Sequence, residues 1–137
     1  MKSKKNKLFT LALVAMTMLF SAQIVFAATT WSNPVLFNLN HDDDYWHNNL
    51  SEANTKTTSS TNYDVYNIAQ TMTVNPSFRL INSAREARSS TINMPNPGYQ
   101  KVGGGNTGTI GYAYYSSTKP DILQTSDGSI RLQFKSR

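Results

Sequence analysis

The side chains best suited to chemistry lie in one short stretch, His41-Asp42-Asp43-Asp44-Tyr45-Trp46-His47. Imidazoles and carboxylates at this density are ligand types that bind zinc or calcium. The candidate ligands are His41, Asp42, Asp44 and His47, and zinc suits them better because both histidines can contribute. The spacing matches no established site and lacks the glycine and bidentate glutamate of an EF-hand loop. The alternative is a solvated acidic loop. We therefore assign these residues no metal and predict no cofactor.

A second group of side chains could hold an anionic surface. Arg79, Arg85 and Arg88 follow one another closely, and Tyr115 belongs to a tyrosine-rich segment. Guanidinium groups recognise phosphate and carboxylate, and an exposed phenol ring can stack on a sugar or enter a lipid interface. These four residues are the candidate surface contacts. The alternative is that the arginines are simply solvated.

The chain offers little for covalent or acid–base catalysis. It has 2 histidines and no cysteine, and no serine lies in a Gly-x-Ser-x-Gly nucleophile elbow. A hydrolase with paired carboxylates could use Asp64 with Asp121 or Glu86, but the sequence gives no reason for these residues to meet. We therefore expect a protein that is not an enzyme, with a hydrolase as the remaining enzymatic alternative.

Gly103, Gly105 and Gly108 formally fit the dinucleotide-binding pattern G-x-G-x-x-G. That pattern has meaning where it follows a strand and opens a helix. Here it runs into Thr109-Ile110-Gly111-Tyr112, which alternates as a strand does, so the glycines predict a hairpin turn.

Apolar residues that alternate at period two predict the elements that position these groups. The expected strands include residues 33–40, a hairpin of 62–74 with 78–82, a short strand at 90–94, a central strand at 107–117, and a hairpin of 122–125 with 129–135. Tyr112 and Tyr114 are expected to face the core. Residues 41–61 show no period and predict a polar loop or a disordered linker without regular structure.

About seven short strands without a convincing helix indicate an all-β domain. The first choice is a small antiparallel β-sandwich of the immunoglobulin-like kind, and a small open barrel is the second. The expected division is a signal segment at 1–27, a first strand with an acidic polar loop at 28–61, and the core of one sandwich domain at 62–137.

Residues 1–27 have the three-part pattern of a secretory signal peptide. A lysine-rich start is followed by an apolar run from Leu8 to Phe20 and by small residues that end at Ala27. The run is shorter than the ~20 residues of a spanning helix. We predict cleavage after Ala27, an extracellular protein and no membrane span after cleavage. The absence of cysteine suits secretion by a Gram-positive bacterium.

Removal of this segment changes the charge. The full chain carries 13 lysines and arginines against 8 acids, and four of the lysines lie in 1–27, which leaves a net charge of +1. Such a balance excludes a nucleic-acid partner, because phosphate binding requires a basic stripe. Residues 28–64 hold five of the acids and one basic residue. This N-terminal part of the mature chain is therefore acidic, and residues 65–137 are mildly basic.

Four segments follow one another in an order typical of a known family: Phe78-Arg79-Leu80-Ile81-Asn82-Ser83, then Ser89-Ser90, then Gly103 to Gly108, then Tyr112-Ala113-Tyr114-Tyr115. Over residues 62–135 the chain resembles small exported Gram-positive proteins with an immunoglobulin-like sandwich, many of unknown function. The resemblance implies the fold and a cell-surface, competition or bacteriocin-related setting. It supplies no catalytic residues.

These observations predict a secreted, non-enzymatic binding protein that acts at the cell surface or in the medium. Its expected partner is a cell-wall polymer, a membrane surface or another protein. The alternative is a membrane-active or bacteriocin-like toxin, or its exported accessory protein.

Overall fold

The computed structural model describes residues 30–137, so the predicted signal peptide at 1–27 lies outside the described residues. The described chain is all-β and contains no helix. Accordingly, no segment of it is a helix of the length and apolarity needed to cross a membrane. The eight strands are β1 (Val35–Leu39), β2 (His47–Thr55), β3 (Tyr63–Gln70), β4 (Ser77–Ile81), β5 (Ile92–Asn93), β6 (Gln100–Gly103), β7 (Ala113–Lys119) and β8 (Gly128–Lys135).

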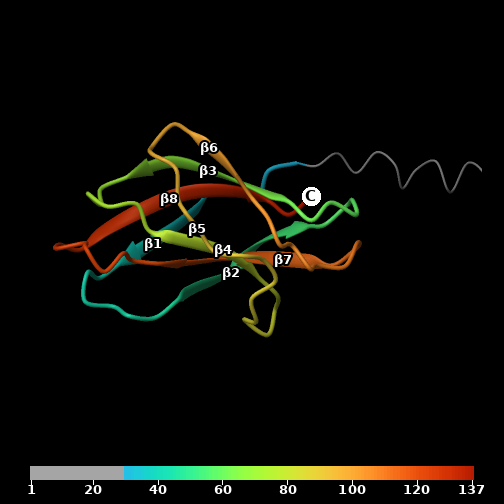
Figure 1. Ribbon diagram of the computed structural model, residues 1–137, viewed down its shortest axis with the longest axis horizontal. Coiled ribbons are helices and arrows are strands. Elements are labelled where there is room, and N and C mark those ends of the chain that lie inside the picture. Colours follow the sequence, from blue (N-terminus) through green and yellow to red (C-terminus); the bar gives the residue numbers. More distant parts are fainter. Residues whose placement is uncertain (1–29) are drawn as a thin grey trace, which may run out of the picture.

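The strands form two antiparallel sheets that pack face to face (Figure 1). One sheet has the order β1-β8-β3-β6 and the other β2-β7-β4-β5. The predicted small β-sandwich is therefore confirmed at the level of architecture. The immunoglobulin-like subtype stays a prediction.

Alternation explains the strands that the sequence predicts best. In β8, Ile130, Leu132 and Phe134 are fully buried, and the residues between them are partly or fully exposed. β1 shows the same pattern and pairs with β8, with Val35 opposite Leu132. A strand with one apolar face must turn it toward a second sheet to remove it from water. In β4, Phe78 and Leu80 supply that facing surface.

The core lies between the two sheets and is rich in aromatic rings. Phe78 lies between Tyr63 and Phe134, with ring centroids 5.8 and 6.2 Å away. Tilted ring pairs at such distances add attraction beyond the burial of their area. The other buried apolar residues of this cluster are Val35, Phe37, Leu39, Val65, Met72, Leu80, Met94, Ile130 and Leu132.

The expectation of a structureless loop over 41–61 is wrong, because residues 47–55 form β2. Apolar alternation does not predict this strand, because its sequence, His-Asn-Asn-Leu-Ser-Glu-Ala-Asn-Thr, has no apolar face. It is an edge strand held to β7 through the backbone, with an irregularity between Asn49 and Asn54. Buried Asn54 is fixed by Ser136, whose backbone N–H donates to Asn54 Oδ1 at 2.7 Å.

Both predicted hairpins are also wrong. β3 and β4 belong to different sheets, and residues 122–125 form no strand before β8. The central strand β7 begins at Ala113 rather than at residue 107, so Tyr114 is buried as expected while Tyr112 is exposed. The glycine-rich run crosses from β6 in one sheet to β7 in the other, so the predicted hairpin turn there is wrong as well.

Gly103 shows why this run needs glycine. A Cβ atom at this position would lie 2.1 Å from the ring of Tyr63, and one at Gly108 would lie 2.6 Å from the ring of Tyr114. The run therefore allows backbone to pass close to two buried tyrosine rings. No helix follows it within the described residues, so the context of a dinucleotide-binding motif is missing.

Candidate functional site

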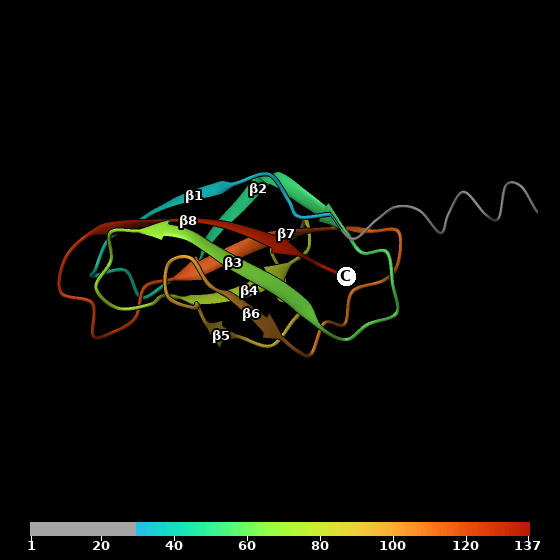
Figure 2. The same cartoon turned by 90° about the horizontal axis from the view of Figure 1, so that it is seen from above.

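Two loops meet at one end of the sandwich, which Figures 1 and 2 show opposite the connections 56–62 and 104–112. Loop 40–46 joins β1 to β2, and loop 120–127 joins β7 to β8. They lie together because β2 and β7 are antiparallel, with His47 at the start of β2 opposite Thr118 near the end of β7. We call this the acidic end, because the two loops carry Asp42, Asp43, Asp44, Asp121 and Asp127.

His41 ties the two loops together. Its Nδ1 lies 2.8 Å from Asp127 Oδ1, its backbone N–H donates to the same oxygen at 3.0 Å, and its Nε2 lies 3.1 Å from Asp42 Oδ1. The hydrogen bond to Asp127 is the main cause that raises the pKa of His41 above its ordinary 6.5. The same contact lowers the pKa of Asp127 below its ordinary 3.8. We call this contact the His41–Asp127 latch; when His41 is protonated, it is an ion pair across the rim of the site.

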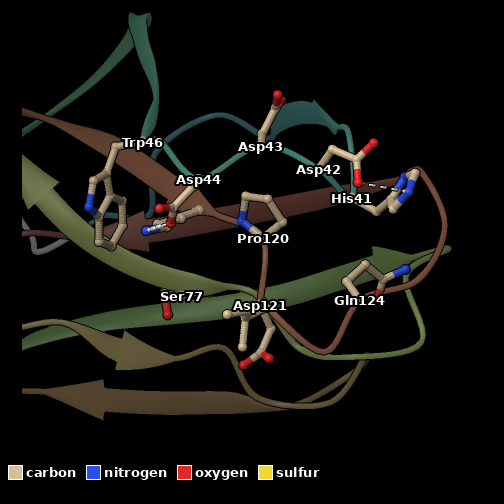
Figure 3. A pocket seen from close by; sticks show the side chains of 11 residues that line it. His41, Asp42, Asp43, Asp44, Trp46, Ser77, Pro120, Asp121 and Gln124 are labelled. Atoms are coloured by element: carbon tan, nitrogen blue, oxygen red, sulfur yellow. Dashed lines mark ion pairs between the residues drawn. The ribbon is translucent and has the colours of Figure 1, made fainter.

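Beside this latch lies a cleft of about 700 Å³, which we call the end cleft. In Figure 3, Trp46 and Asp44 lie at one side of it, His41 at the other, and Pro120 between them. The lining residues are His41, Asp42, Asp43, Asp44, Trp46, Ser77, Lys119, Pro120, Asp121, Ile122 and Gln124. Carboxylates that can accept hydrogen bonds therefore share the cleft with the apolar surfaces of Trp46, Pro120 and Ile122.

Trp46 is positioned by Arg79, whose guanidinium carbon lies 4.0 Å from the centroid of its ring. Arg79 belongs to β4, and its side chain covers one side of the indole while the indole also lines the end cleft. Burial lowers the pKa of Arg79, and its Nε has no hydrogen-bond partner. Attraction between the guanidinium and the ring face holds the indole in this position.

The remaining charges of loop 40–46 are engaged locally. Asp44 forms an ion pair with Lys119, which lowers the pKa of the Asp44 carboxyl. Asp43 Oδ2 lies 2.8 Å from His47 Nε2, and the ring of Tyr45 stacks on His47 with centroids 4.7 Å apart. The charge of Asp43 is the main cause that raises the pKa of Tyr45.

The four candidate metal ligands do not converge. His41 faces Asp127 and Asp42, Asp44 faces Lys119, and His47 faces Asp43. Over residues 30–137, no group of three or more histidines and acids is arranged to hold a metal ion. The geometry instead favours ion pairs that shape the loop.

The arginines proposed as surface contacts also separate. Arg79 lies under Trp46, whereas Arg85 and Arg88 lie in the connection from β4 to β5, where Arg88 pairs with Glu86 at 2.6 Å. Tyr115 is half-buried on β7, opposite Ile81. Arg88 lines a second cavity of about 430 Å³, which we call the arginine pocket. Its lining residues are Asn82, Ser83, Arg88, Thr107, Thr109, Tyr112, Ala113 and Tyr114.

The carboxylates considered for a hydrolase are not brought together. Asp64 is fully buried on β3 and accepts two hydrogen bonds from Arg137, at 2.6 and 2.7 Å. Glu86 pairs with Arg88, and Asp121 lies at the acidic end, where its Oδ1 accepts the backbone N–H of Leu123. Each of the three is occupied by a different partner.

Sequence reasoning found loop 40–46 but missed the wall that loop 120–127 supplies. The sequence predicts that Ile122 belongs to a strand over residues 122–125, whereas it lies in this loop. The available signal was the lack of alternation between Ile122 and Leu123, two neighbouring apolar residues after a proline. Gln124, which is buried, gives no sequence signal at all.

Comparisons of the chain with protein-family models, with curated proteins and with solved structures found no match. The resemblance to small exported Gram-positive sandwich proteins therefore stays a prediction, and the end cleft must be interpreted from its own geometry.

Proposed function

We propose that this protein is an exported, non-enzymatic binding module that holds a polyhydroxylated polymer of the cell wall in the end cleft. The observation that carries the proposal is the placement of Trp46 beside several carboxylates in one cleft. Sugars have C–H faces that pack on aromatic rings and hydroxyl groups that donate to carboxylates. A cleft with apolar walls and a few polar groups is the usual form of a small-ligand site.

Export is part of the same proposal and is supported by the pattern of residues 1–27. A binding role suits the site because Asp42, Asp43 and Asp44 each lie at ion-pair distance from a basic side chain, and Asp121 accepts a backbone N–H, so their positions are fixed. The same pairing opposes a role in proton transfer.

The first experiment is co-sedimentation of the purified protein with intact Gram-positive cells, with survivors counted. Retention in the pellet with full viability supports the proposal, and soluble wall glycan should then compete. Retention with cell death supports the toxin alternative. Protein that stays in the supernatant contradicts a surface-binding role.

The site is tested with two tryptophan variants. Trp46→Ala should weaken binding at least tenfold, which corresponds to about 1.4 kcal/mol. Trp31→Ala is the matched control, because Trp31 packs against Tyr66 and Lys135 on the other sheet. If both variants fold and lose the same amount of binding affinity, the end cleft is excluded as the binding site.

A further inference from the structure

The connection β6–β7, at the end of the sandwich opposite the acidic end, forms one wall of the arginine pocket (Figure 2). The connection β4–β5 forms the other wall, and the first residues of β7 close the pocket between them. The walls are joined directly, because the backbone carbonyl of Arg88 accepts the N–H of Thr107 at 2.8 Å. The pocket has a volume of about 430 Å³. Since a cavity of about 150 Å³ already holds benzene, this volume accommodates a sugar ring with its hydroxyl groups.

Hydrogen bonds fix both walls of the pocket. In the connection β4–β5, the side chain of Asn82 closes a turn: its Oδ1 accepts the backbone N–H of Glu86 at 2.9 Å, and its Nδ2 donates to the Glu86 carboxylate at 2.8 Å. In the other wall, the hydroxyl of buried Tyr114 accepts the backbone N–H of Thr109 at 2.5 Å. A pocket that is already formed in this way loses little conformational entropy when it binds a ligand.

The charge of the pocket is balanced. Of the described residues that line it, Arg88 alone carries a charge, and its guanidinium pairs with the carboxylate of Glu86 at 2.6 Å. An anionic ligand would therefore meet a cation that is already neutralised. A neutral polar ligand can still accept hydrogen bonds from the guanidinium N–H groups that the pair does not use. This balance favours a neutral ligand over an anion.

The other groups that line the pocket suit a sugar. The hydroxyls of Ser83 and Thr109 form no hydrogen bond within residues 30–137, and each can donate to or accept from a sugar hydroxyl. Tyr112 is 66% exposed at the pocket, and its backbone is held in place because its carbonyl accepts the N–H of Lys56 at 3.0 Å. An exposed phenol ring offers a flat apolar face on which the C–H groups of a sugar ring can pack.

We infer that the arginine pocket is a carbohydrate site for a neutral sugar. Tyr112 packs on the sugar ring, and Ser83, Thr109 and Arg88 form hydrogen bonds with its hydroxyl groups. The pocket shares no lining residue with the end cleft. This inference therefore does not depend on the proposed function, and the two sites can be tested separately.

The test titrates the purified, isotope-labelled protein with chitotriose, a neutral trimer of N-acetylglucosamine, and follows the backbone amide signals by NMR. The signals of Thr107, Thr109 and Tyr112 should shift together and saturate. Tyr112→Ala should weaken this binding about tenfold, because it removes the ring on which the sugar packs. Ser83→Ala and Thr109→Ala should each weaken it about threefold, because each removes one hydrogen bond. The matched control is Tyr99→Ala, since Tyr99 is 67% exposed but does not line the pocket.

Several results would overturn the inference. One is the absence of shifts in the pocket at about 10 mM chitotriose, a concentration that fills a site with a Kd of about 1 mM. Another is equal weakening by Tyr112→Ala and Tyr99→Ala in folded proteins; if Tyr112→Ala does not fold, Thr109→Ala takes its place. Displacement of chitotriose by inorganic phosphate would exclude a site for neutral sugars. Shifts confined to Trp46 and its neighbours would overturn this inference while supporting the end cleft. Trp46→Ala should leave the shifts in the pocket intact, so failure of the proposed function does not decide this test.

Discussion

Replacement of Arg137 by alanine should destabilise the fold by about 2–3 kcal/mol. Asp64 is fully buried on β3, and Arg137 donates to both of its carboxylate oxygens. Removal of one partner from a buried ion pair costs about 3–5 kcal/mol, because the other charge stays buried without compensation. Two features reduce that range here. The Arg137 side chain is 36% exposed, and Asp64 keeps a hydrogen bond from Gln100 at 3.2 Å and Lys135 at 4.0 Å.

The assay is urea unfolding monitored by tryptophan fluorescence, since Trp31 packs against Tyr66 on the sheet that contains Asp64. A loss of about 2–3 kcal/mol lowers Tm by roughly 8–15 °C in a domain of this size. Arg131→Ala is the control, because Arg131 is exposed on β8 and its loss should change stability by less than about 0.5 kcal/mol.

A double-mutant cycle separates the ion pair from general effects of truncation. In the background Asp64→Asn, which keeps the shape and removes the charge, Arg137→Ala should cost at least about 1 kcal/mol less than in the wild type. Equal costs in the two backgrounds would refute the reasoning, as would a cost below about 0.5 kcal/mol for Arg137→Ala alone.

Three further predictions follow from single contacts. Gly103→Ala places a Cβ 2.1 Å from the ring of Tyr63 and should cost about 1–3 kcal/mol in chemical unfolding, whereas Gly104→Ala, whose nearest atom is 3.9 Å away, should be nearly neutral. The His41–Asp127 ion pair should contribute fully between about pH 3.8 and pH 6.5, the ordinary pKa values of the two groups. It should be lost as pH rises through the raised pKa of His41, and also as pH falls through the lowered pKa of Asp127; the His41 NMR signals should report the upper transition, and His41→Gln should remove it. Burial raises the pKa of Tyr63 to about 12. The contribution of neutral Tyr63 to stability is therefore present below its ordinary pKa of 10.0 and is lost as pH rises through about 12. Ultraviolet titration should show one tyrosine that ionises last, and a uniform titration of all tyrosines would contradict this.

The sequence predicts an element wherever one face of a strand is apolar and buried. β8 and β1 were predictable for this reason, since their alternation follows directly from contact with the opposite sheet. β2 was not, because an edge strand can be held by backbone hydrogen bonds to β7 and needs no apolar face. The pairing of strands was also hidden. A turn signal marks a change of direction, but it does not say whether the next strand returns to the same sheet, and β3 to β4 and β7 to β8 both cross to the other one.

In the candidate site, too, the sequence predicts the residues of one local segment but not the residues that the fold brings to them. The histidines and aspartates of loop 40–46 were recognisable because they are consecutive. Their partners Lys119 and Asp127 lie far along the chain and are joined to them only through the antiparallel pairing of β2 with β7 and of β1 with β8. That separation explains why a metal site was a reasonable hypothesis from the sequence. The local density of ligands was visible, but the two distant partners, Lys119 for Asp44 and Asp127 for His41, were not.

The fold gathers more acidic residues at one end of the sandwich than the order of residues in the sequence suggests. In the sequence, Asp121 and Asp127 belong to the mildly basic remainder and balance the bases around them. In the fold, the connections β1–β2 and β7–β8 emerge at one end, so these two acids join the three of loop 40–46. At the other end, Arg88 of the β4–β5 connection lines the arginine pocket and pairs with Glu86. A molecule with one acidic end orients an approaching cationic partner before contact. This effect should weaken as salt is raised, because the Debye length falls to ~8 Å at physiological ionic strength.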